Sequence, residues 1–164
     1  MGVTWLDILC LLLVLAVASV ASWQGTLRTT VALVGFYFGG KLTLFLARRL
    51  AHIVHWHADP HINAALLFTV VFVFVAVLVI VAAYLIEQLT QFSLEEADHL
   101  VAFPLGLVLG MTLVHWVVQV LAWGYADNPS FILLMNNSPI ARELLTFQAT
   151  KGAIARLFQW SQSP

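Results

Sequence analysis

The chain has 164 residues, of which 62% are hydrophobic and only 9% are charged, and its formal net charge is −1. Soluble domains carry about 25% charged residues, so this composition excludes an ordinary soluble globular protein. The nearly neutral balance gives no basic footprint for nucleic acid, and a single cysteine excludes an intrachain disulfide.

Four apolar runs dominate the sequence, and each has about the 20 residues that a helix needs to cross the hydrocarbon core. They cover residues 5–22, 30–50, 63–86 and 100–123. We therefore predict an all-α integral membrane protein with four transmembrane helices and a C-terminal amphipathic interfacial helix. Residues 1–124 form the transmembrane domain, and residues 125–164 form a polar break and the amphipathic segment.

The first helix begins beside residues that favour a helix start. Thr4 is a plausible N-cap, and the Asp7 carboxylate in the first turn is favoured by the helix dipole. Only residues 24–26 separate this helix from the next. Because so short a link allows only a tight turn, we predict that the first two helices are antiparallel neighbours.

The second helix contains Gly39-Gly40-Lys41 near its centre. A glycine weakens a helix interior by about 1 kcal/mol, and a lysine at mid-bilayer costs about 3 kcal/mol. One interpretation is a functional intramembrane charge, which needs a crevice or a polar partner from Asp7, Glu87 or His115. The other is that the helix breaks at the glycines and Lys41 lies near the interface.

Small residues recur every four positions in two of the helices. Gly35 and Gly39 form one GxxxG motif, and Gly106 and Gly110 form another. Such faces let two helix backbones approach closely. They predict helix packing either within one bundle or between two copies.

Histidines provide the remaining candidate ligands. Four lie in the second loop, at His52, His55, His57 and His61. Imidazoles at these spacings suit a transition metal, but no cysteine accompanies them, so interfacial histidines are the favoured interpretation. His115, one helical turn before Gln119, is a candidate proton relay or haem ligand, and the favoured interpretation of this pair is an interhelical hydrogen-bonded patch.

The last segment, about residues 139–160, alternates apolar and charged residues and predicts one amphipathic helix at the interface. Charge gives an estimate of the orientation. After four crossings the side of both termini carries Arg48, Arg49, Arg142, Lys151 and Arg156, whereas the other side carries only Arg28. The positive-inside rule then places both termini in the cytoplasm.

Several polar and small residues stand at or near the ends of the predicted helices: Asp7, Gly25, Arg28, Asp98, Gly106, Gly110 and Ser138. In this order, over roughly residues 4–145, they resemble the pattern of the colicin V production protein (CvpA) family. An aspartate opens the first helix, and a Gly-x-x-Arg turn follows it. A second aspartate precedes the glycines of the fourth helix, and a serine lies beyond that helix.

The chain departs from the family pattern mainly in charge. The arginine after the second aspartate is His99, one glycine is Ala102, and the arginine between the last glycines is Leu109. Family members rich in arginine there would place the first and third loops in the cytoplasm, which implies the opposite orientation. The resemblance also implies a bacterial inner-membrane protein linked by name to colicin V production or export.

We therefore expect a protein without enzymatic activity, cofactor or metal, acting as an accessory or scaffold in toxin secretion or envelope maintenance. Its partners would be the bilayer and either a second copy or another membrane protein. One alternative is a small oligomeric channel or transporter that uses Lys41 and His115. Another is an accessory subunit of a respiratory or photosynthetic complex.

Overall fold

The structure is a computed structural model and describes residues 3–90, 98–148 and 151. In element order, these residues contain α1 (Trp5–Gln24), α2 (Thr26–Ala51), α3 (Pro60–Thr90), α4 (Asp98–Gly124), α5 (Pro129–Asn137) and α6 (Pro139–Thr146). The helices α1 to α4 are long and apolar enough to cross a membrane. The predicted fold class is therefore confirmed.

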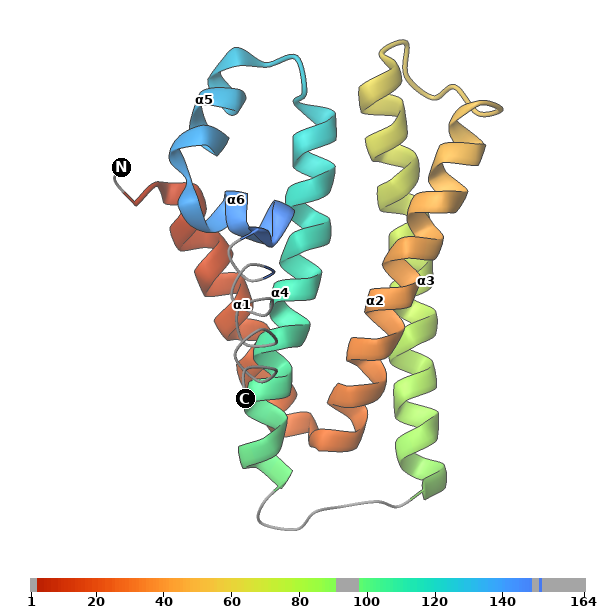
Figure 1. The fold of residues 1–164 in the computed structure, drawn as a ribbon. Coiled ribbons are helices and arrows are strands. Elements are labelled where there is room, and N and C mark those ends of the chain that lie inside the picture. Colours follow the sequence, from red (N-terminus) through yellow and green to blue (C-terminus); the bar gives the residue numbers. More distant parts are fainter. Residues whose placement is uncertain (1–2, 91–97, 149–150, 152–164) are drawn as a thin grey trace, which may run out of the picture.

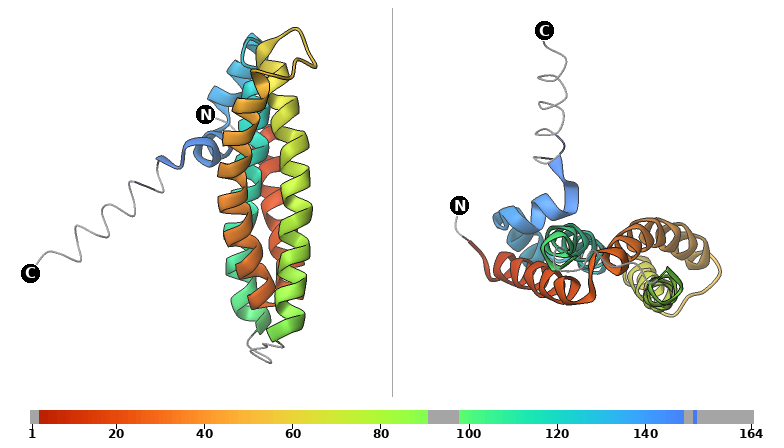
Figure 2. Two further views of the ribbon diagram at one scale, coloured as in Figure 1. Left: turned by 90° about the vertical axis from the view of Figure 1, so that its right-hand side faces the viewer. Right: turned by 90° about the horizontal axis from the view of Figure 1, so that it is seen from below.

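The four long helices pack as two pairs, α1 with α4 and α2 with α3, and α4 also contacts α2 and α3 (Figure 1, Figure 2). The helices α1 and α2 run antiparallel, as predicted, but they diverge from the turn at Gly25 (Figure 1). The prediction that they would pack as neighbours was wrong. Instead, Gly106 on α4 packs closely against Ala18 and Ala21 of α1.

The second helix is continuous through Gly39 and Gly40, so the interpretation that it breaks there was wrong. Both glycines are buried. A Cβ built on Gly39 would lie 2.7 Å from Cγ1 of Val75, and one on Gly40 would overlap the Trp116 ring. Close packing against α3 and α4 thus outweighs the weak helix propensity of glycine.

The C-terminal region differs from the single helix predicted over residues 139–160. The helix α6 ends at Thr146, and Phe147 takes a left-handed conformation with φ of 51°. The remainder of the predicted helix falls largely outside the described residues. An additional helix, α5, runs back beside the α1–α4 pair, and α6 then crosses that pair near the start of α1 (Figure 1).

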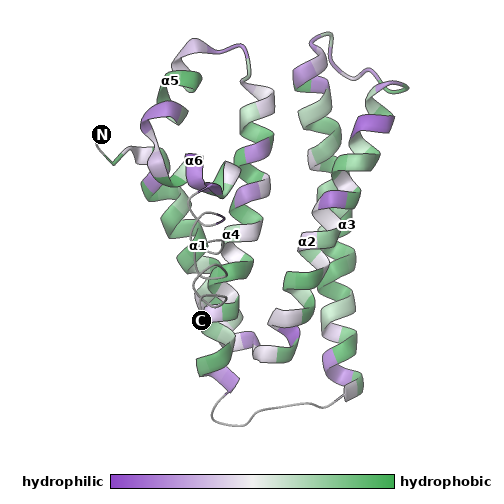
Figure 3. Cartoon of the chain, viewed as in Figure 1, coloured by the Kyte–Doolittle hydropathy of each residue, from purple (hydrophilic) through white to green (hydrophobic). Residues whose placement is uncertain are grey.

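The outer surface of the long helices is largely apolar (Figure 3), as a bilayer requires. Inside, one apolar cluster joins α1, α4 and α6 and includes Leu6, Cys10, Val114 and Leu144. A second joins α2, α3 and α4 around Phe68 and includes Trp116. Since α4 contributes to both clusters, it is the helix on which the others assemble.

Candidate functional site

A buried carboxylate, Asp7, lies in the first turn of α1. Its Oδ2 accepts hydrogen bonds from the backbone N–H and the hydroxyl of Thr4, both at 3.0 Å. The Asp7 N–H donates to Oγ1 of Thr4 in return, at 3.3 Å. This reciprocal pair is a capping box, so the predicted cap of the first helix is confirmed.

The same carboxylate also caps α6. Its Oδ1 accepts from the backbone N–H groups of Ile140 at 2.9 Å and Ala141 at 3.1 Å. Ser138 occupies the N-cap position of α6, but its side chain makes no capping bond there. Its hydroxyl oxygen instead lies 2.7 Å from the Leu134 carbonyl oxygen and within hydrogen-bonding distance of the Thr4 hydroxyl.

Asp7 and Ser138 have no exposed surface, although 131 positions separate them in the sequence. We call the group formed by Thr4, Asp7, Ser138, Ile140 and Ala141 the first clasp. It joins the beginning of the chain to α6 by satisfying the backbone donors at two helix starts, which otherwise have no partner within their helices.

A second clasp closes the opposite end of the bundle and consists of Gly25, Thr26 and Asp98. Gly25 has φ of +86°, which a side chain rarely adopts. Oδ1 of Asp98 accepts from the Thr26 N–H at 2.8 Å, and the Thr26 hydroxyl donates to the Asp98 carbonyl at 2.9 Å. Since Gly25 offers no side chain to cap α2, Asp98 of α4 caps it instead.

His99 and Ser22 extend this second clasp. The Ser22 hydroxyl donates to the His99 carbonyl at 3.3 Å, and Nδ1 of His99 lies 2.6 Å from the Ser22 carbonyl oxygen. Hydrogen bonds to the backbone carbonyls of Ser22 and His99 therefore tie α1 to α4.

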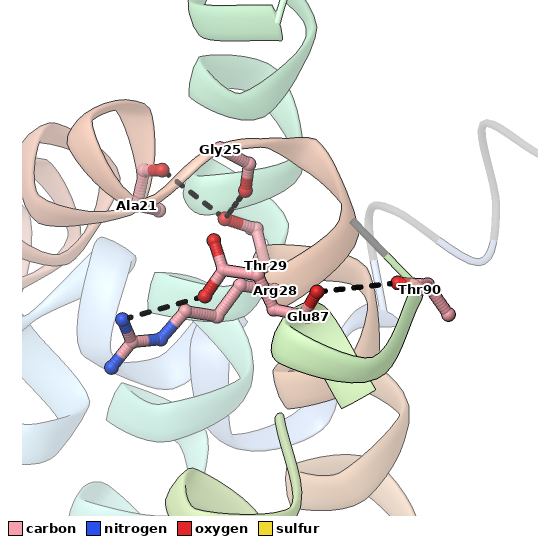
Figure 4. A network of polar contacts seen from close by, with 6 residues as sticks. All are labelled: Ala21, Gly25, Arg28, Thr29, Glu87 and Thr90. Atoms are coloured by element: carbon pink, nitrogen blue, oxygen red, sulfur yellow. Dashed lines mark hydrogen bonds and ion pairs between the residues drawn. The ribbon is translucent and has the colours of Figure 1, made fainter. Parts of the chain in front are cut away.

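Arg28 links the same turn to α3. Its guanidinium lies 3.8 Å from the Glu87 carboxylate (Figure 4). It also lies over the Tyr84 ring. Beside it, the Thr29 hydroxyl donates to the Gly25 carbonyl at 2.7 Å and to the Ala21 carbonyl at 3.2 Å (Figure 4). The Gly-x-x-Arg turn thus holds the first three helices together.

The two glycine motifs lie at contacts between helices of one chain. A Cβ on Gly106 would lie 2.9 Å from Cα of Ala18, and one on Gly110 would lie 2.8 Å from the Val14 carbonyl oxygen. Gly35 and Gly39 meet valine side chains of α3. Both motifs therefore make close helix contacts within one chain.

Lys41 points back along α2, as expected for a helical side chain. Its Nζ donates to the Tyr37 hydroxyl at 2.8 Å and lies 4.2 Å from the centre of that ring. The sequence did not identify Tyr37 as the partner. Of the partners considered, Glu87 pairs with Arg28 and Asp7 belongs to the first clasp.

Lys41 and His115 line one cavity of about 730 Å³ between α2, α4 and α6. Nδ1 of His115 lies 2.7 Å from the Leu144 carbonyl oxygen, so its interhelical bond runs to the backbone of α6. Gln119, half-buried one turn further along α4, takes no part in this bond. The structure therefore brings Lys41 and His115, but not Gln119, to one cavity.

The histidines of the second loop remain dispersed. Among residues 3–90, 98–148 and 151, no group of three or more potential ligands gathers around a common point. Nδ1 of His57 accepts from the Asp59 N–H, and the Asp59 carboxylate accepts from the N–H of His61 at the start of α3. Asp59 therefore caps that helix. Much of the acidic third loop lies outside the described residues.

Sequence reasoning missed α5, although its start carries a clear signal. The Asn128 side chain accepts from the N–H groups of Ser130 and Phe131, and Pro129 occupies the first turn. An asparagine cap followed by proline is a typical helix start. The sequence interpretation treated these residues only as a polar break.

Comparison with known families places these features in context. A family model described as "Colicin V production protein" matches residues 6–149, a span that contains Asp7 and Ser138 of the first clasp and the whole second clasp. Comparisons with curated proteins and with solved structures find no match. With four helices able to cross a membrane, the chain is a multi-pass membrane protein and belongs to the colicin V production protein family.

Proposed function

We propose that this chain is a non-enzymatic accessory or scaffold protein of the bacterial inner membrane, acting in toxin secretion or envelope maintenance. One observation carries the proposal. The polar residues of the family pattern, Asp7, Asp98 and Ser138, direct their hydrogen bonds to helix ends and to the backbone. A carboxylate bound to several backbone N–H groups is poorly suited to exchange protons with a substrate.

The arrangement of helices supports the same role. The helix α4 contacts α1, α2, α3 and α6. The first clasp fixes the start of α1 to α6, and the second fixes the start of α2 to α4. The product is a preformed helical platform, which is what an accessory subunit presents to a partner. We propose that this partner is either a second copy or another membrane protein.

Asparagine substitution tests the structural role of the carboxylates. Asp7→Asn and Asp98→Asn keep the Oδ1 acceptor but remove the proton-exchanging group. In a strain lacking this protein, each variant should restore toxin secretion or envelope integrity, measured as secreted toxin and as uptake of a hydrophobic dye. Asp7→Leu, which removes the acceptor, should fail and should also reduce the amount of folded protein in the membrane.

A folded but inactive Asp7→Asn variant would contradict the proposal. If Asp7→Asn accumulates in the membrane with wild-type helicity and thermal stability but restores nothing, the carboxylate acts chemically and the scaffold proposal is wrong. Membrane levels measured by immunoblot separate that outcome from misfolding.

A small channel or transporter is the second candidate, favoured by the cavity that Lys41 and His115 share. Purified protein in liposomes should then conduct ions or a small solute, and Lys41→Leu should abolish the flux. Flux equal to that of empty liposomes would contradict this alternative.

A further inference from the structure

A row of cations follows one face of α2 near the second loop. Lys41, Arg48, Arg49 and His52 line an open pocket of about 380 Å³, together with Leu44 and Phe45. All four basic or imidazole side chains are exposed. Among the described residues, none of the three permanent cations forms an ion pair with a carboxylate. The pocket is therefore a site of uncompensated positive charge.

The depth of these residues is set by helix geometry. The helix α2 ends at Ala51, so a rise of about 1.5 Å per residue places Arg48 about 5 Å and Lys41 about 15 Å below its end. Arg48 thus lies at headgroup depth, and Lys41 lies within the hydrocarbon region. In Figure 3, the end of α2 near the second loop includes hydrophilic residues, and most of the helix below it is apolar.

The cationic pocket adjoins a mostly apolar groove. Lys41 lines both the pocket and the cavity of about 730 Å³ between α2, α4 and α6. Below Lys41 that cavity is walled by Leu33, Phe38, Val108 and Met111. A charged upper part joined to an apolar lower part matches the shape and polarity of a phospholipid.

Because the pocket and the groove adjoin, we infer that the α2 face binds an anionic phospholipid. The phosphate contacts Arg48 and Arg49 of the pocket, which lie within about 5 Å of the end of α2, and an acyl chain passes Lys41 into the groove between α2 and α4. Charge complementarity selects an anionic headgroup over a zwitterionic one. This inference goes beyond the proposed scaffold role and does not depend on it, because neither clasp contributes a residue to the site.

Competition between two headgroups tests the inference. The purified full chain is incubated with equal amounts of phosphatidylglycerol and phosphatidylcholine in mild detergent, and the retained lipids are counted by native mass spectrometry. The wild type should retain phosphatidylglycerol preferentially. Since each basic residue near a headgroup contributes a factor of about five, the Arg48→Gln/Arg49→Gln double variant should lose about twenty-five-fold of this preference.

Two further variants serve as controls. Arg142→Gln removes an exposed cation from α6 and should leave the preference unchanged. Val108→Trp fills the groove from an exposed position on α4 and should reduce retention of both lipids while the cations remain. Circular dichroism and gel filtration confirm that each variant is folded.

Three outcomes would overturn the inference. They are equal retention of both lipids by the wild type, an unchanged preference in the double variant, and unchanged retention in Val108→Trp. A photocrosslinking residue at Phe45 in native membranes gives an independent result. A phospholipid adduct supports the site, whereas a protein adduct would assign this face to an acidic partner helix instead.

Discussion

In both clasps an aspartate carboxylate accepts hydrogen bonds from free N–H groups at a helix start, but the two carboxylates differ in how deeply they are buried. In the first clasp, Asp7 has no exposed surface and accepts four hydrogen bonds, from residues at the start of α1 and of α6. In the second, Asp98 is half-buried and its side chain accepts one described bond, from Thr26. Both carboxylates cap a helix that starts elsewhere in the sequence.

The difference indicates which clasp holds the fold more strongly. A buried donor that loses its acceptor costs far more than an exposed one, which water can satisfy. The first clasp therefore dominates the stability of the C-terminal region, and the second mainly sets the geometry of a turn. The four predictions below test this ranking, beginning with the largest expected effect.

Asp7→Leu should lower the free energy of unfolding by at least about 3 kcal/mol, because the buried N–H groups of Ile140 and Ala141 lose their acceptor. The change is measured by thermal or denaturant unfolding in detergent micelles. Asp7→Asn is the matched control and should lose clearly less. Equal losses for the two variants would mean that the Oδ1 acceptor alone does not stabilise the first clasp, and that the negative charge or the second oxygen is required.

Gly110→Ala should destabilise the α1–α4 contact by about 1–3 kcal/mol, because the added Cβ would lie 2.8 Å from the Val14 carbonyl oxygen. Gly124→Ala on the same helix is the control, since its Cβ would lie 3.6 Å from the nearest atom and makes ordinary contact. Unfolding of both variants is compared in micelles that contain one chain each. A change confined to oligomer formation would instead assign the glycine face to self-association.

Asp98→Ala should cost about 1 kcal/mol, the usual loss when a helix N-cap acceptor is removed. Asp127→Ala, at an exposed loop position, should change the unfolding free energy by less than about 0.5 kcal/mol. If Asp98→Ala were as damaging as Asp7→Leu, the proposed ranking of the two clasps would be wrong.

Arg28→Gln should have the smallest effect, below about 1 kcal/mol, because the ion pair with Glu87 is partly exposed. A double-mutant cycle with Glu87→Gln isolates the pair energy, which should decrease as salt is added. A salt-independent coupling would indicate that the packing of Arg28 on Tyr84 carries the effect.

The main architecture followed from the sequence because it depends on local properties. Run length and hydropathy predicted four transmembrane helices, and Thr4 with Asp7 predicted the start of the first. Helix pairing did not follow, since it depends on how Ala18 fits Gly106 across the bundle. The second role of Asp7, as the cap of α6, was also invisible, because no local pattern connects residues so far apart.

The candidate site was predicted only in outline. The polarity of Lys41 and His115 indicated a face between the second and fourth helices, and the structure places both at one cavity. The contribution of α6 was missed, because the predicted helix over 139–160 gave no reason to place Phe147 or Leu145 beside α2. The pocket that contains Arg48 meets this cavity at Lys41, which depends on α2 being unbroken at Gly39 and Gly40.

The first clasp has a consequence for biogenesis. Asp7 enters the membrane with the first helix, whereas its partners Ile140 and Ala141 are synthesised 133 and 134 residues later. At a translation rate of about 5–20 residues per second, Oδ1 of Asp7 waits on the order of ten seconds for these two N–H groups. During that interval water at the membrane surface must satisfy Oδ1, so the first helix reaches its final position only after residues 140 and 141 have been made.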